Sequence, residues 1–101
     1  MSGLYCYIVS YDIRDQKRLY QVHRAMLGFG QPVHYSVFRC DLTRLGRVEM
    51  ASVLIDLIDE EEEDRIMIID MGPVDGRVAE RIEFLGVHPE ENGREEKVII
   101  E

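Results

Sequence analysis

The sequence predicts an α+β domain whose elements follow in the order strand, helix, strand, strand, helix, strand. Apolar runs rich in β-branched and aromatic residues mark the strands, and two stretches between them place apolar residues three or four positions apart, as helices do. The length of 101 residues suits one domain with a modest hydrophobic core.

The first expected strand covers residues 4–13, and its side chains suit an interior position in a sheet. Asp12 stands near the end of this strand, where the sheet stops and solvent or a ligand begins. This stretch alone leaves two interpretations open. Asp12 either caps backbone N–H groups in the turn after the strand, or it is a metal-binding or acid–base carboxylate.

Residues 14–27 are expected to form the first helix, with Asp15 near its start, where a carboxylate suits the positive end of the helix dipole. Helical spacing predicts an apolar side made of Leu19, Val22 and Met26. The opposite side is basic. Gly28 is expected to end the helix in a left-handed conformation.

The next extended stretch, residues 33–42, is either one long strand or two short strands that meet near Ser36. His34 has no metal-ligating residue at a suitable spacing, so we interpret it as a surface or interface histidine. Thr43 is the expected N-cap of a second helix over residues 44–59. The apolar spacing in this helix predicts a buried side made of Leu45, Val48, Ala51 or Ser52, Ile55 and Ile58, widened by Leu54.

Residues 60–64 are five consecutive acids. They predict a solvated linker, since a calcium-binding loop needs spaced ligands and a turn glycine. Residues 65–72 then predict a buried strand. Residues 81–86 alternate like a further strand, although residues 78–83 also fit the start of a short helix.

The C-terminal stretch 97–100 is apolar and typical of an edge strand that needs a sheet to dock on. We therefore expect one folded domain over residues 1–87 and an extension over residues 88–101 that carries an edge strand. The element order is that of the ferredoxin-like α+β arrangement, with both helices on one face of an antiparallel sheet. The other face is then bare, which favours a homodimer.

The net charge of −8 is unevenly distributed: residues 1–50 carry +3 and residues 51–101 carry −11. An acidic total argues against a protein that coats nucleic acid non-specifically. It leaves room for a local basic strip in the N-terminal half, made of Arg14, Lys17, Arg18, Arg39, Arg44 and Arg47.

No run approaches the roughly 18–20 apolar residues of a membrane span, and no secretory signal is visible. We therefore expect a cytoplasmic protein without a membrane partner. Cys6 and Cys40 lie in separate strand-like runs and are expected to be buried, reduced thiols.

Three motifs together resemble the Cas-two family of CRISPR-associated adaptation proteins, which includes CRISPR-associated endoribonucleases. They are the tripeptide Tyr-Asp-Ile at 11–13, the tripeptide Gly-Phe-Gly at 28–30 and the tripeptide Ser-Val-Phe at 36–38. The basic pair Lys17 and Arg18 and the strand after the acidic run add to the likeness. The resemblance covers about residues 4–86.

This resemblance implies a ferredoxin-like homodimer in which Asp12 of each protomer meets its mate near the two-fold axis. It implies an Mg²⁺ or Mn²⁺ ion shared between the two protomers, with Asp12, Ser36 and Phe38 as catalytic residues and Asp12 as the metal ligand. It also implies a scaffold role in spacer acquisition, with the CRISPR integrase (Cas-one) and nucleic acid, RNA or DNA, as partners.

Pro32, His34 and Arg39 depart from the usual family pattern, which leaves the phosphate path and efficient nuclease activity open. Three hypotheses therefore stand. The chain is a metal-dependent endonuclease, a non-catalytic scaffold for the integrase and its DNA, or, remotely, a ferredoxin-like small-molecule regulatory domain.

Overall fold

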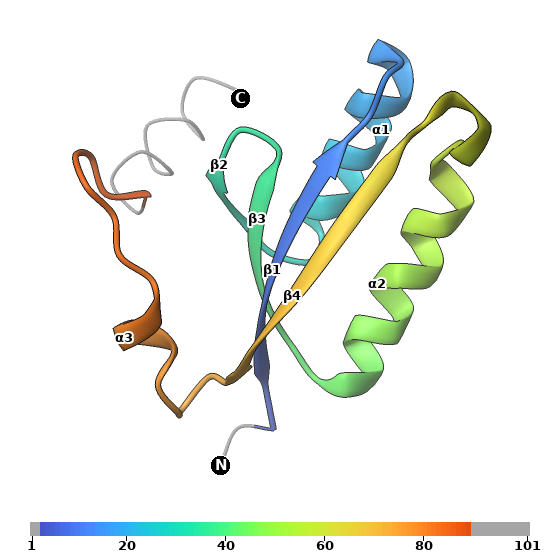
Figure 1. Ribbon diagram of the computed structural model, residues 1–101. Helices are drawn as coiled ribbons and strands as arrows, with labels where there is room; N and C mark the ends of the chain where they lie inside the picture. Colours follow the sequence, from blue (N-terminus) through green and yellow to red (C-terminus); the bar gives the residue numbers. More distant parts are fainter. Residues whose placement is uncertain (1–2, 90–101) are drawn as a thin grey trace.

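A computed structural model describes residues 3–89 of the chain. Its elements are β1 (Tyr5–Asp12), α1 (Gln16–Leu27), β2 (Gln31–His34), β3 (Val37–Leu42), α2 (Arg44–Leu57), a 3₁₀ turn η1 (Glu60–Glu62), β4 (Arg65–Pro73) and α3 (Val78–Arg81). The four strands form one antiparallel sheet in the order β2-β3-β1-β4 (Figure 1). This confirms the predicted α+β, ferredoxin-like βαββαβ arrangement.

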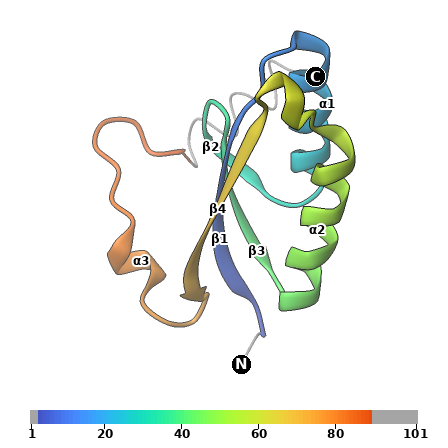
Figure 2. The same cartoon turned by 45° about the vertical axis from the view of Figure 1, so that its right-hand side comes forward.

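The sheet is covered on one side by α1 and α2, while α3 lies on the other side (Figure 2). Alternation along β1 decides which residues enter the core, because every second side chain points to the helices. Tyr7, Val9 and Tyr11 do so and are buried. They pack with a cluster from the other elements: Val22 and Met26 of α1, Phe38 and Cys40 of β3, and Met50 and Leu54 of α2.

The other side of the sheet is what we call the open face. Strand register places Ile8 beside Ile69 and Ser10 beside Met67 across β1 and β4. Met67 is 55% exposed and Ile69 is 40% exposed in the single chain. The expectation of a bare apolar face is therefore confirmed around Met67 and Ile69, whereas Cys6, which shares this face near the start of β1, is fully buried.

Residues 33–42 form two strands, which settles the alternative left open by the sequence. Ser36 lies in the turn between them and has a left-handed φ of 64°. A left-handed residue interrupts an extended chain, since L-residues adopt it mainly in turns. His34 at the end of β2 is exposed, as expected.

Gly28 ends α1 as predicted, but the expected left-handed conformation is wrong. Its φ is −80°, in the right-handed region. The helix is closed instead by backbone N–H groups that donate to carbonyls of the last turn, from Gly28 to Ala25 at 3.0 Å and from Phe29 to Met26 at 2.9 Å. Right-handed closure of this kind does not require glycine.

The predicted buried side of α2 is largely wrong. Leu45, Val48 and Ile55 are exposed, and Met50, which was not predicted, is buried. Leu54 is buried and Ile58 packs against the core, as predicted. Apolar residues surround much of this helix, so their spacing alone does not identify the face that meets the sheet. The N-cap prediction is confirmed, because the Thr43 hydroxyl accepts from the backbone N–H of Gly46 at 2.9 Å.

The acidic run divides into exposed and buried parts, so the prediction of a uniformly solvated linker is wrong for Asp64. The first three acids form η1 and are exposed. The Asp64 side chain is fully buried and accepts from the guanidinium of Arg18 at 2.7 Å. Burial of this carboxylate is possible because its charge is paired and hydrogen-bonded.

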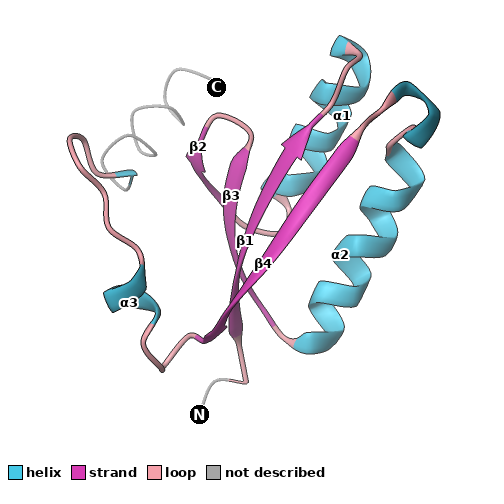
Figure 3. Ribbon diagram, in the orientation of Figure 1, coloured by secondary structure: helices cyan, strands magenta, loops and turns pink. Residues whose placement is uncertain are grey.

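β4 lies at an edge of the sheet, and all of its residues keep some exposure in the single chain, so the prediction of a buried strand is wrong there. Residues 81–86 do not form a strand within the described chain; α3 forms instead and an irregular segment follows it (Figure 3). The predicted edge strand at 97–100 and most of the 88–101 extension lie outside the described residues.

Both cysteines are buried free thiols, as predicted. Burial raises the pKa of the Cys40 thiol to about 12, which keeps it protonated at neutral pH. In residues 3–89, no helix has the length and apolarity needed to cross a membrane.

Candidate metal and nucleic-acid site

Asp12 is the last residue of β1 and lies on the open face, where the strand register sets it opposite Arg65 of β4. Its side chain is exposed. Between residues 3 and 89, no hydrogen bond or ion pair engages this carboxylate. The same part of the chain contains no group of three acidic, histidine or cysteine side chains placed to hold a metal ion. One protomer therefore supplies a single carboxylate as a possible metal ligand here.

Ser36 lies next to the end of β1. Its backbone carbonyl accepts from the N–H of Tyr11 at 3.1 Å, which ties the β2–β3 turn to the strand that carries Asp12. A non-glycine residue with positive φ stores strain, and such residues are enriched at functional sites.

Phe38 is in a different position from the one a catalytic residue needs. Its side chain is fully buried, with its ring centroid 6.2 Å from that of Tyr11 and 5.5 Å from that of His23. It therefore cannot contact a substrate on the surface of this chain. Its contribution to the site is to position Tyr11 and His23 by packing.

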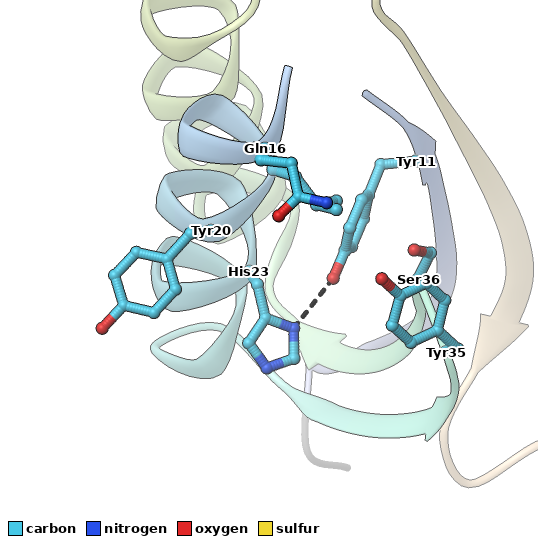
Figure 4. Close-up of a pocket in the computed structure, with 7 residues that line it drawn as sticks. Tyr11, Gln16, Tyr20, His23, Tyr35 and Ser36 are labelled. Atoms are coloured by element: carbon cyan, nitrogen blue, oxygen red, sulfur yellow. Dashed lines mark hydrogen bonds between the residues drawn. The ribbon is translucent and has the colours of Figure 1, made fainter. Parts of the chain in front are cut away.

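A pocket of about 250 Å³ opens between α1 and the β2–β3 turn (Figure 4). At its base, the hydroxyl of Tyr11 lies 2.9 Å from Nδ1 of His23 in a hydrogen bond. Burial, followed by the nearby Tyr35, raises the pKa of Tyr11 to about 12, while a hydrogen bond with Ser36 opposes this shift. The pocket is lined by Tyr11, Gln16, Leu19, Tyr20, His23, Tyr35 and Ser36.

This pocket was missed by the sequence analysis. In the sequence, Tyr11 stands out only as part of the Tyr-Asp-Ile motif beside Asp12. His23 lies within the first helix, and no motif marks it. Period-two alternation sends the side chains of Tyr11 and Asp12 to opposite sides of the sheet. The one available signal was therefore that Tyr11 points toward the helix that carries His23.

The basic residues near the start of α1 differ in whether an ion pair within the chain already occupies them. Arg18 binds the buried Asp64 through Nε at 2.7 Å and Nη2 at 3.3 Å, and Arg14 reaches Glu63 at 3.2 Å. Lys17 is exposed and has no ion pair among the described residues. Lys17 is therefore free to meet a phosphate, as is the exposed Arg65 opposite Asp12, which also has no ion pair among residues 3–89.

Arg44 begins α2 and is engaged by its own chain. Its Nη1 donates to Tyr7 at 2.8 Å and to Asp70 at 2.7 Å, and its guanidinium lies 3.7 Å from the ring centroid of Tyr5. These contacts raise the pKa of Arg44 and lower that of Asp70. Arg39 pairs with Asp41 at 3.1 Å on the open face.

The six predicted basic residues do not form one strip on this chain. Arg14, Lys17 and Arg18 lie at the end of the sheet where β1 finishes, whereas Arg44 and Arg47 lie at the start of α2 near the opposite end (Figure 1). A nucleic acid that contacts both groups has to run along the molecule. The role of each residue in binding stays a prediction.

The family model for the CRISPR associated protein Cas2 matches residues 5–75. The chain is 46% identical over 71 residues to a CRISPR-associated endoribonuclease Cas2 of Rhodospirillum rubrum, a match that covers 70% of this chain and 69% of the relative. It is 39% identical over 69 residues to a CRISPR-associated endoribonuclease Cas2 of Geobacter sulfurreducens, a match that covers 68% of this chain and 72% of the relative.

Two solved structures resemble the fold closely. A hypothetical protein, TT1823 of Thermus thermophilus, has a TM-score of 0.71 and 31% identity over 86% of this chain and 96% of its own. The crystal structure of Streptococcus pyogenes Cas2 has a TM-score of 0.66 and 31% identity, and the match covers 80% of this chain and 99% of that one. Sequence and fold matches each cover most of the described residues, and the range of the family model includes β1 with its terminal Asp12. The chain therefore belongs to the CRISPR-associated Cas2 family.

Proposed function

We propose that this chain acts in CRISPR adaptation as a homodimer that hydrolyses phosphodiester bonds of RNA or DNA with a divalent metal. The names of its relatives, which call them endoribonucleases, support this assignment. The observation that carries it is the placement of Asp12 at the end of β1 on the open face, as an exposed carboxylate that has no hydrogen-bond or ion-pair partner among residues 3–89.

The open face supports association of two copies around that carboxylate. Ile8, Met67 and Ile69 form an apolar surface beside Asp12, and an apolar surface of this kind gains free energy when it is covered. A two-fold axis through this face brings the two copies of Asp12 together, since an isologous contact pairs each residue near the axis with its own copy.

The donor set fits a hard divalent cation. Mg²⁺ is commonly bound through one or two carboxylates and keeps several waters and substrate oxygens as its other ligands. Asp12 of both protomers would hold Mg²⁺ or Mn²⁺, which when bound polarises a phosphodiester and supplies hydroxide near neutral pH.

Other residues of the chain orient the nucleic acid. Lys17 offers an exposed ammonium at the start of α1, near the end of β1, where it can meet a phosphate. The Ser36 hydroxyl lies in the turn joined to Tyr11 and can hydrogen-bond a phosphate or a water. Arg18 instead holds the loop before β4 in place through Asp64.

The test replaces the Asp12 carboxylate with an uncharged amide of nearly the same shape. Asp12→Asn is expected to abolish Mg²⁺-dependent cleavage of single-stranded RNA and DNA by the purified dimer, because an amide is a poor ligand for a hard cation. Asp56→Asn is the matched control, since Asp56 is an exposed aspartate on α2. Cleavage by Asp12→Asn at the wild-type rate shows that the activity is a contaminant or belongs to another site.

A non-catalytic scaffold is the second candidate. The observation that favours it is that one protomer places a single carboxylate, Asp12, at this site, and residues 3–89 contain no group of three side chains that could hold a metal. In that case Asp12→Asn still joins the integrase (Cas-one), captures DNA and supports spacer integration. Loss of integration by a variant that still binds the integrase counts against this candidate. The family match argues against the third hypothesis, a small-molecule regulatory domain.

A further inference from the structure

We propose that the pocket between α1 and the β2–β3 turn binds one unpaired nucleobase of a single-stranded nucleic acid. This inference rests on the proposed function and adds the subsite that recognises the substrate. The pocket lies beside the end of β1, and Tyr11 at its base immediately precedes Asp12. Because the side chains of Tyr11 and Asp12 point to opposite faces of the sheet, a strand whose base enters the pocket passes around the end of β1 to bring a phosphodiester to Asp12.

Two exposed tyrosines flank the pocket from different elements. Tyr20 comes from α1 and is 60% exposed, and Tyr35 comes from the β2–β3 turn and is 86% exposed. Rings displayed in this way are suited to stacking, because every base has a flat π-face that an aromatic side chain covers. The tie between Ser36 and Tyr11 holds the turn that carries Tyr35 against β1.

The floor of the pocket offers polar groups that can hydrogen-bond the edge of a nucleobase. Gln16 directs its amide toward the Tyr11 ring in Figure 4, and this amide has no hydrogen-bond partner among the described residues. An amide donates and accepts at once, as the hydrogen-bonding edge of a base requires. The hydrogen bond between Tyr11 and His23 fixes the two rings beneath it.

The size of the pocket and the charge at its rim favour a single base. Its volume of about 250 Å³ is below the roughly 300–1,000 Å³ of pockets that enclose whole drug-sized ligands. The Arg24 guanidinium lies 5.7 Å from the ring centroid of Tyr20, which lines the pocket, and donates to its hydroxyl at 3.3 Å. This cation suits a phosphate beside an inserted base.

The pocket also discriminates between forms of nucleic acid. A base inside a duplex is stacked and paired, so it reaches the pocket only after unpairing, which costs free energy. RNA and DNA present the same base chemistry to stacking rings. We therefore expect single strands of either type to bind more tightly than duplexes of the same length.

The experiment uses the full chain and single-stranded 15-mers, RNA and DNA, that carry 2-aminopurine, a base whose fluorescence falls on stacking. Binding by the wild type is expected to quench the fluorescence. Tyr35→Ala is expected to weaken binding about tenfold and to remove most of the quenching. Tyr35→Phe keeps the ring and is expected to behave like the wild type, as is the control Leu45→Ala, whose side chain is exposed on α2. A 15-mer with abasic sites is expected to bind no better to the wild type than to Tyr35→Ala.

Equal binding and quenching by Tyr35→Ala and the wild type overturns the proposal, as does a preference for duplex or equal affinity for the abasic strand. If the wild type binds no oligonucleotide, the proposed function fails, and the pocket is then tested by itself with adenosine monophosphate. Shifts of the ring NMR signals of Tyr35 and His23 on titration support the pocket, and unchanged signals overturn it. Cleavage by Tyr35→Ala under saturating substrate separates loss of base binding from loss of the Asp12 chemistry.

Discussion

Asp64 is the last of six consecutive acids, residues 59–64, yet its environment differs from that of its neighbours. Its carboxylate accepts from the backbone N–H of Arg14 at 3.0 Å, from the backbone N–H of Asp59 at 2.9 Å and from the Arg18 guanidinium. These donors hold the pKa of Asp64 well below its usual range, chiefly through Arg18. The residue thus joins the start of α1 to the loop that precedes β4.

Asp64→Ala is expected to lower the free energy of unfolding by roughly 3 kcal/mol, because it leaves Arg18 and two backbone N–H groups without their acceptor. Glu62→Ala is the control within the same run, since Glu62 is exposed. Urea denaturation measures both. Equal stability of the two variants would contradict the role assigned to Asp64.

The ion pair between Asp64 and Arg18 also predicts how the stability of the protein depends on pH. A carboxylate whose pKa is lowered on folding contributes stability above its unfolded pKa of about 4 and loses it as the pH falls toward the folded pKa. The stability difference between the wild type and Asp64→Ala is therefore expected to be full near pH 7 and to shrink below about pH 4. A difference that stays constant down to pH 2 would show that the charge is not involved.

Lys17 and Arg18 are adjacent in the sequence but differ in their contacts, and this separates their expected roles. Lys17→Ala is expected to weaken nucleic-acid binding and to reduce the slope of log affinity against log salt by about one, as loss of one phosphate contact does. Arg18→Ala is expected to destabilise the fold instead, because it leaves the buried Asp64 unpaired. Salt-dependent affinity and thermal denaturation of both variants distinguish the two effects.

The β2–β3 hairpin depends on a close approach between the chain after α1 and β3. A Cβ atom at Gly30 would lie 2.3 Å from the carbonyl oxygen of Arg39 and 2.6 Å from Sγ of Cys40. Real side chains do not tolerate such contacts with backbone, so glycine is required here for space rather than for its φ angle. This approach sets where the hairpin turn, with Tyr35 and Ser36, stands relative to β1.

Gly30→Ala is expected to lower the free energy of unfolding by about 1–3 kcal/mol, the range seen when a packed interior is overfilled. Gly28→Ala is the control, because Gly28 has a right-handed φ and its new Cβ has one short contact, 3.3 Å from the Ala25 carbonyl oxygen. Denaturant titration compares the variants. A Gly30→Ala protein as stable as Gly28→Ala would mean that the hairpin shifts at little cost.

The whole molecule is asymmetric across its sheet. One face is covered by α1 and α2, and the open face presents exposed apolar side chains beside Asp12 (Figure 2). The proposed metal site needs two copies of Asp12, so assembly and activity are linked. A change that blocks the dimer is therefore expected to remove activity while leaving the Asp12 side chain in place.

Met67→Lys places a charge on the open face and is expected to shift the protein from dimer to monomer and to abolish Mg²⁺-dependent cleavage. Leu45→Lys is the matched control, since Leu45 is exposed on α2, away from the open face. Light scattering coupled to size exclusion measures the mass, and the cleavage assay is run on the same fractions. An active monomeric Met67→Lys protein would contradict a metal site shared between protomers.

The sequence by itself determined the order of elements, the fold class, the first strand to within about one residue at each end, the carboxylate of Asp15 at the start of the first helix and Thr43 as the N-cap of the second. These features depend on local pattern: alternation in β1, helical spacing in α1, and the side chains of Asp15 and Thr43 that accept from backbone N–H groups. It also singled out Asp12 as a candidate, because a carboxylate that ends an apolar strand is visible without a structure, and its role as a metal ligand stays a prediction. Family motifs along the first half of the chain pointed to the same residue.

Only the tertiary structure decided which apolar side of α2 is buried, that Asp64 is buried with Arg18, and that Tyr11, His23, Tyr35 and Ser36 share a pocket. Each depends on contacts between residues distant in the sequence. Asp64 and Arg18 are 46 positions apart, for example, and local spacing contains no information about such a pair. Asp12 and Tyr11 are adjacent in the chain, yet the pleat sends one to the open face and the other to the pocket.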